Sequence, residues 1–236
     1  MLSKFIYPPI LTGILAGLII SIISIFFLYP IIYEAELLEI TPSLQLDNHE
    51  HVHEHNTNAS HEHIENQTEF KHFQKRNFIT LMVNIAVITG YAFIIMGLTN
   101  LLKITINLRN SIFIGLVGFL CFYLLPSIAL TPQLPGAQYT ESLNYRQLIW
   151  LSIVCSSLLG FVIIYLSTSK LIKLTGIVLV LFPLALILIL NSNIPMDIIG
   201  GLHYKFIYYT FLSNLIMWLT IAVIFNFINS KSGLSD

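Results

Sequence analysis

Apolar residues along this chain come in six long blocks, which are separated by short polar segments and one long polar segment. A helix that crosses the hydrocarbon core of a bilayer needs about 20 mainly apolar residues. Apart from Lys173 near the start of the fifth block, the blocks contain no Asp, Glu, Lys or Arg. We therefore predict six transmembrane helices, over residues 9–29, 78–102, 112–130, 148–166, 171–190 and 206–228.

Composition supports the same fold class. Hydrophobic residues make up 56% of the 236 residues and charged residues 10%, whereas a soluble domain carries about a quarter charged residues. Backbone polar groups in lipid must be satisfied internally, which favours helices. We predict an all-α integral membrane protein of about six transmembrane helices, with a long disordered His-rich loop between the first and second. Its parts are a first transmembrane helix (1–30), a His-rich extracytoplasmic loop (31–77), a bundle of about five transmembrane helices (78–230) and a cytoplasmic tail (231–236).

The placement of Lys and Arg favours an inside N-terminus and C-terminus. With that orientation, the short inner segments hold six basic residues and a single acid, Asp236. The outer segments hold the other eleven acids and all eight histidines. Because short inner loops are enriched in Lys and Arg, we predict a multi-pass protein of the cell (plasma or inner) membrane with both termini cytoplasmic. The net charge of −1 and the lack of a basic patch exclude a nucleic-acid partner.

Small residues predict where helices touch. Gly13 and Gly17 form a GxxxG pair in the first helix, and Gly115 and Gly118 lie in the third. Such residues let two membrane helices approach closely. Glycine is also common in membrane helices in general, so the alternative is that these glycines have no specific packing role.

The long polar segment is rich in histidine. Seven of the eight histidines fall within residues 49–72, with glutamates between them. Neutral imidazole binds Co, Ni, Cu and Zn ions. Alternate residues of an extended chain lie about 6–7 Å apart on one side, so a flexible chain can fold two or three imidazoles around one ion. The alternative is a solvated linker. The predicted metal ligands are His49, His51, His53, His55, His61, His63 and His72.

A proline-rich segment follows the third block. Pro132, Pro135 and Gly136 prevent regular helix there, and Arg146 follows before the fourth block. One interpretation is a segment that dips back into the protein and exposes carbonyl groups to an ion pathway, which is tolerated only where protein or water covers it. The other interpretation is a rigid connector, with Arg146 anchoring it or contacting lipid phosphates.

Acidic residues cluster just beyond the first block. Glu34 and Glu36 could draw a divalent cation from the histidine segment toward a pathway, or they could belong to an ordinary solvated helix extension. A minor second metal site in the last outer loop would use Met196, Asp197 and His203.

Four stretches follow one another in a distinctive order: residues 12–36, with the Gly/Ala stripe and a proline followed by Ala35-Glu36, then the His-x-His run, then 125–136, and then 145–150. Together they resemble the CbtA family of probable cobalt transporter subunits. The chain departs from the family pattern at Gln133, which replaces an acid, and in having six predicted spans where the family is drawn with five. The resemblance implies cobalt uptake, often linked to cobalamin synthesis, beside a small single-span partner subunit (CbtB) that carries its own His motif.

These observations predict a membrane transporter subunit for uptake of a divalent transition metal, most simply Co2+, with Ni2+ or Zn2+ as alternatives and no organic cofactor. The alternative is a membrane metal sensor or chaperone that binds nickel or zinc without moving it across. An intramembrane enzyme acting on lipids would need converging acid and base groups, and no motif joins them, so we predict that the chain is not an enzyme. The lack of acidic residues within the spans, where Lys173 near one end is the single charge, and the lack of a Walker sequence favour a facilitated or partner-energised path.

Overall fold

The computed structural model describes residues 2–46, 62–134, 142–190 and 200–231, and all regular structure within these ranges is helical. In chain order the elements are α1 (Leu2–Phe27), α2 (Tyr29–Leu46), α3 (Glu62–Leu101), α4 (Leu108–Phe119), the short π-helix η2 (Leu120–Leu124), α5 (Leu125–Ala129), α6 (Leu143–Leu166), α7 (Lys170–Leu190) and α8 (Gly200–Lys231). The predicted all-α class is confirmed.

Five stretches of the described residues are long and apolar enough to cross a membrane. They are Phe5–Phe27, Lys75–Leu101, Leu108–Ala129, Leu143–Leu166 and Gly201–Lys231. These stretches correspond to the first, second, third, fourth and sixth predicted spans. The fifth predicted span, 171–190, falls on α7, a single helix of 21 residues. The chain is therefore a multi-span helical membrane protein, and the total of six spans stays a prediction.

The helices extend farther into the polar segment than the apolar pattern indicated. We expected a loop over residues 31–77, but α2 continues to Leu46 and α3 already begins at Glu62. The apolar criterion detects only the part of a helix that lipid would surround, so it misses polar helical extensions. Pro30 does interrupt the first helix as expected: α1 ends at Phe27, and Pro30 lies in the first turn of α2, where a missing N–H is tolerated.

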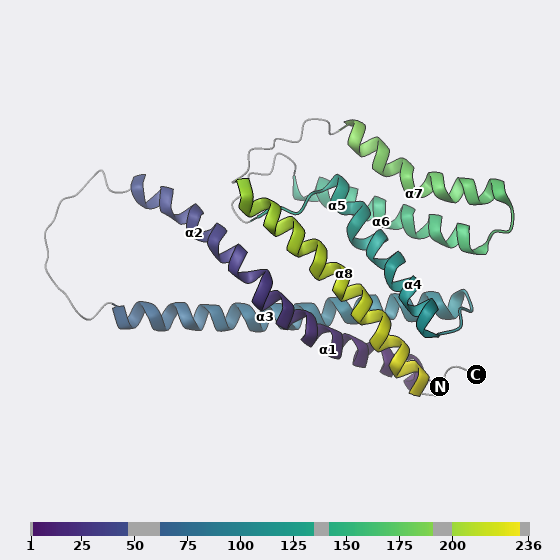
Figure 1. Cartoon of the computed structure of the whole chain (residues 1–236), viewed down its shortest axis with the longest axis horizontal. Coiled ribbons are helices and arrows are strands. Elements are labelled where there is room, and N and C mark those ends of the chain that lie inside the picture. The colour runs from purple at the N-terminus through teal and green to yellow at the C-terminus, as the bar shows by residue number, and fades with distance from the viewer. Residues whose placement is uncertain (1, 47–61, 135–141, 191–199, 232–236) are drawn as a thin grey trace, which may run out of the picture.

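The core lies where α1, α3, α4 and α8 pack together. Its largest fully buried side chain is Trp218 of α8, and Ile88 of α3 and Phe225 of α8 belong to the same apolar cluster. The α6–α7 hairpin lies beside this bundle and contacts α5. Figure 1 shows the start of α1, the end of α8, the α3–α4 connection and the α6–α7 connection at one end, which we call the terminal end. We call the opposite end the distal end; α2 and the first half of α3 project beyond it (Figure 1).

Glycines set the closest helix contacts. A Cβ atom on Gly17 of α1 would stand 2.8 Å from the Cα atom of Ile85 in α3, and one on Gly13 would stand 2.7 Å from the Cα atom of Thr89. A Cβ atom on Gly115 of α4 would stand 2.9 Å from the carbonyl oxygen of Trp218. The predicted packing role of these glycines is confirmed, because each allows backbones to approach more closely than any side chain would permit.

The third span changes helix type near its distal end. The π-helix η2 lies between α4 and α5, and the N–H of Leu125 donates to the carbonyl of Leu120, five residues earlier. Pro126 follows directly and has no N–H to continue an α-helical ladder, so the wider turn accommodates it. Cys121 of η2 is fully buried, and α6 packs against η2, which joins the hairpin to the bundle.

Candidate functional site

The predicted metal-capturing histidines fall mostly outside the described residues. The histidines outside are His49, His51, His53, His55 and His61. Four other predicted residues also fall outside the described ranges: Pro135, Gly136, Met196 and Asp197. The backbone of α3 includes His63 and His72 in its first half. Metal capture by these histidines therefore stays a prediction, and the described residues show what lies at the two ends of the histidine segment.

Three segments that are far apart in the sequence meet in a buried apolar cluster at the distal end of the bundle. They are the start of α2, the segment after α5 and the start of α8. The cluster consists of Ile31, Ala35, Leu134, Leu202 and Phe206. We call it the distal cluster. Two of its members lie in predicted pathway segments, because Ala35 lies between Glu34 and Glu36, and Leu134 lies between two prolines.

An ion pair joins α2 to α3 beside this cluster. Nη1 of Arg76 donates to both carboxylate oxygens of Glu36, at 2.8 and 3.0 Å, and about a third of each side chain is exposed. The guanidinium also lies over the ring of Tyr29, 5.7 Å from its centroid. Glu36 is therefore held by a fixed cation, whereas Glu34 is exposed on α2. The two predicted acids consequently differ in their freedom to meet a metal ion.

Within the described part of the chain, several buried oxygen atoms on the segments that reach the distal cluster have no hydrogen-bond partner. They are Oε1 of Gln133, Oγ1 of Thr210 and Oδ1 of Asn77. Gln133 precedes Leu134 of the cluster, and Thr210 lies one turn beyond Phe206 on α8. Burying a polar atom without a partner costs free energy, so each is an acceptor that a water molecule or a cation would satisfy.

The remaining predicted site residues lie at the same end. Pro132 is half-buried in the segment after α5, and Arg146 is half-buried in the first turn of α6, where its N–H donates to the carbonyl of Ser142 at 3.2 Å. His203 of α8 is 6% exposed and follows Leu202 of the cluster. Within the described ranges, no group of three or more His, Cys, Asp or Glu side chains could hold a metal ion. The described part thus gathers the predicted segments but forms no complete site.

Sequence reasoning missed two features of this region. It placed residue 76 within the outer loop (31–77) and gave it no role, yet Arg76 is the partner of Glu36. A signal was present, because Arg76 stands just before the second apolar block and Glu36 just after the first. It also gave Gln133 no role, because the family pattern has an acid there, although the buried Gln133 oxygen is an unpaired acceptor.

These features define a polytopic helical membrane protein whose distal end assembles the segments that flank a histidine-rich stretch. The pattern of one family covers nearly the whole chain, matching residues 2–229, and the chain belongs to that family, CbtA, described as a probable cobalt transporter subunit. A transporter subunit is not an enzyme. No curated protein and no solved structure matches the chain.

Proposed function

We propose that the chain moves Co2+ into the cell as a subunit of a metal uptake system, and that its histidine segment captures the ion. The distal cluster is the observation that carries this proposal. The histidine segment runs between α2 and α3, and the ion pair of Glu36 and Arg76 fastens these two helices together beside the cluster. In this proposal α2 and α3 lead a captured ion back to the distal cluster, where the proline-rich segment and the start of α8 meet α2.

The chemistry of the ligands suits a late divalent transition metal. Imidazole binds Co2+, Ni2+ and Zn2+ in its neutral form, which predominates above a pKa of about 6.5. The predicted capture ligands are His49, His51, His53, His55, His61, His63 and His72. Ni2+ and Zn2+ are the alternative cargoes, because imidazole affinity follows a general metal order and not the identity of one ion.

Oxygen ligands near the cluster would accept the ion next. Glu34 is exposed, and among the described contacts it forms no ion pair with a basic residue. We therefore place it first among the carboxylates on the route. The carbonyl oxygen of the Gln133 amide and the hydroxyl of Thr210 offer unpaired acceptors deeper in. Pro132 and Arg146 lie at this end, and Pro135 and Gly136 are the other predicted pathway residues of the proline-rich segment. Glu36 serves as a structural partner of Arg76 in this scheme.

The proposal places the distal end outside the cell membrane and both termini in the cytoplasm, following the distribution of basic residues. It includes a small single-span partner subunit with its own histidines (CbtB-like), as the family resemblance implies. The family resemblance also implies a link between this uptake system and cobalamin synthesis, and the proposal includes that link.

Accumulation of radioactive cobalt in cells tests the proposal. The intact chain is compared with a variant in which His49, His51, His53, His55, His61 and His63 are alanine, with nickel and zinc as competitors. Alanine at Asn48, Asn56, Thr57 and Asn58 gives a matched control, because it changes polar residues of the same segment and keeps every imidazole. We expect cobalt accumulation that depends on the chain and weakens at low metal only in the histidine variant.

The opposite outcome is equally clear. If cobalt stays at the background of cells without the chain, while the purified chain still binds metal through its histidines, the transporter proposal fails. The chain would then act as a metal sensor or chaperone that binds the ion and does not translocate it.

A further inference from the structure

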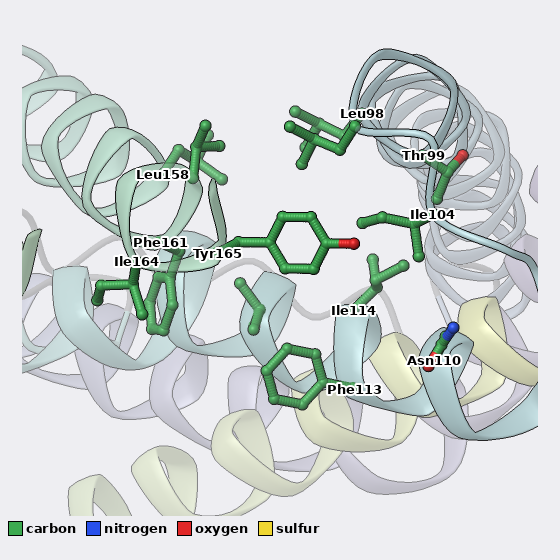
Figure 2. Close-up of a pocket in the computed structure, with 13 residues that line it drawn as sticks. Leu98, Thr99, Ile104, Asn110, Phe113, Ile114, Leu158, Phe161, Ile164 and Tyr165 are labelled. Atoms are coloured by element: carbon green, nitrogen blue, oxygen red, sulfur yellow. The ribbon is translucent and has the colours of Figure 1, made fainter. Parts of the chain in front are cut away.

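A groove opens between α3, α4 and α6 near the terminal end, away from the distal cluster. Its volume is about 280 Å³, and its lining is almost entirely apolar. Leu102 and Ile104 border it from the end of α3 and the turn after it, Phe113 from α4, and Phe161 and Tyr165 from α6. Figure 2 shows the ring of Tyr165 reaching across the groove, with its hydroxyl toward Ile104.

The path of the α6–α7 hairpin explains why this groove exists. Near the distal end, α6 packs against η2 and α5. Toward the terminal end, α4 and α6 diverge (Figure 1). The apolar side chains that face the space are consequently not covered by another described helix. In a bilayer such a space is filled with hydrocarbon, because neither water nor a vacuum satisfies an apolar wall of this size.

The mouth of the groove carries positive charge. Lys103 is exposed and stands between two lining residues, Leu102 and Ile104, and exposed Arg109 precedes the lining residue Asn110. The backbone holds Lys103 at a φ of 52°, a left-handed conformation that is costly for a residue with a side chain. This turn is fixed by hydrogen bonds from Lys103 N to Asn100 O at 3.3 Å and from Ile104 N to Thr99 O at 2.9 Å.

No acidic residue offsets these cations in the neighbouring parts of the chain. Residues 77–134 and 142–190 of the described chain contain no Asp or Glu. Lys170 and Lys173 add two more positive charges at the start of α7, which follows α6 after a short turn. The amino end of α4 adds the positive end of a helix dipole close to Arg109.

We propose that the groove binds one acyl chain of a phospholipid with a net negative head group, whose phosphate lies at Lys103 and Arg109. Charge complementarity selects the head group, because a basic cluster at the membrane surface attracts anionic lipids. The site belongs to the leaflet that faces the terminal end. This inference is independent of which metal, if any, the chain moves.

The lining residues favour an acyl chain over a partner helix as the occupant. Helices of this protein meet each other at glycines, as α1 does with α3 at Gly17 and α4 with α8 at Gly115. The groove is lined by Leu, Ile, Val, Phe, Tyr, Thr and Asn and has no Gly, Ala or Ser. Close helix packing in membranes uses small residues, whereas a flexible hydrocarbon chain adapts to bulky ones.

Native mass spectrometry of the full chain tests the proposal, after release from bilayers made of equal amounts of phosphatidylglycerol and phosphatidylcholine. We expect one retained phosphatidylglycerol in preference to phosphatidylcholine. Lys103→Gln should lower that retention about fivefold, the factor that corresponds to about 1 kcal/mol per basic residue at a membrane surface. Lys103→Arg, which keeps the positive charge, should retain the lipid at the original level. Lys231→Gln, which removes an exposed cation at the same end of the molecule, should leave it unchanged.

A second variant tests the apolar part of the site. Val162→Trp fills the groove and keeps both cations, so it should abolish retention of the lipid. The proposal is overturned if Lys103→Gln retains the lipid at the original level, or if Lys231→Gln loses it equally, since attraction would then be a general surface effect. If inorganic phosphate displaces the lipid and Val162→Trp does not change lipid retention, the site binds an anion and no acyl chain, which also contradicts the proposal. A photo-reactive amino acid placed at position 162 gives an independent readout in cell membranes. If it cross-links to a polypeptide in place of lipid, the proposal is also overturned.

Discussion

At the scale of single residues, the closeness of α1 and α3 depends on the absence of a side chain at Gly17. A methyl group there would stand 2.8 Å from the Cα atom of Ile85, an atom that cannot move without shifting the helix. We expect Gly17→Ala to lower the free energy of unfolding by about 1–3 kcal/mol, as overpacking does. Thermal unfolding of the purified chain in detergent measures the effect.

The control for this change is Gly90→Ala in α3, because nothing lies within 4 Å of a Cβ atom at that position. Alanine loses less conformational freedom on folding than glycine does. This substitution should therefore leave the free energy of unfolding unchanged or raise it by up to about 1 kcal/mol. Equal destabilisation by both substitutions would contradict the idea that Gly17 acts through its contact with α3.

The pair of Glu36 and Arg76 makes a second prediction at the residue scale. Because each side chain is about a third exposed, we expect a coupling energy of about 0.5 kcal/mol. Arg76→Glu should lower the unfolding temperature by placing two carboxylates together, and adding Glu36→Arg should restore most of it. A double-mutant cycle of unfolding temperatures checks this.

Lys75→Glu provides the matched control for that cycle. It makes the same charge change one residue earlier, at an exposed position of α3. A loss of stability in Lys75→Glu that Glu36→Arg also repairs would show a general charge effect and not a specific pair. The positions of Glu36 and Arg76 beside the first two apolar blocks hinted at a contact. The sequence did not show that α2 and α3 cross at the point where these two residues, 40 apart in the chain, meet.

At the scale of elements, apolar blocks predicted the spans well because lipid demands about 20 apolar residues per crossing. The same criterion could not find α2 beyond Leu37 or the first turns of α3, where polar side chains are tolerated. Gly13 and Gly17 were predictable as a contact stripe because a four-residue spacing repeats on one helix face. Their partner helix was not predictable, since any of the other spans could have met that face.

The α6–α7 hairpin has a glycine contact that the spacing pattern did not reveal. A Cβ atom on Gly160 would stand 2.6 Å from the carbonyl oxygen of Gly176, and one on Gly176 would stand 2.9 Å from that of Gly160. We expect Gly160→Val to separate the two helices and lower the unfolding temperature. Gly97→Val is the control, since a Cβ atom there meets nothing within 4 Å. Equal shifts in the two variants would show that valine itself destabilises these helices and that the glycine contact is not the cause.

At the scale of the whole molecule, the distal cluster and the terminal groove could not be predicted from the sequence. Both arise where segments from different parts of the chain meet: Ala35, Leu134 and Leu202 in one case, and α3, α4 and α6 in the other. The histidine run, in contrast, was visible at once because its ligands are adjacent in sequence. A site built from neighbours in the chain can be recognised by spacing, whereas a site built from packing requires the fold.

The number of crossings decides how the two termini relate to the membrane. If α7 crosses the bilayer, six spans put both termini on one side, as the basic residues of the inner segments favour. If α7 does not cross, the five stretches that are long and apolar enough would put the termini on opposite sides. Reporter fusions at the two ends, each active only in the cytoplasm, should therefore both be active.

A fusion after residue 142 makes the test complete. It precedes α6 and should be inactive with either number of crossings, because three spans lie before it. Activity at the N-terminus with inactivity at the C-terminus would show that α7 lies on the membrane or within the protein without crossing. The histidine segment would still lie outside, because α1 alone separates it from the N-terminus, but α8 would then run in the reverse direction. Its start could no longer lie beside α2 at the outer surface, so the distal cluster and the proposed metal route depend on this result.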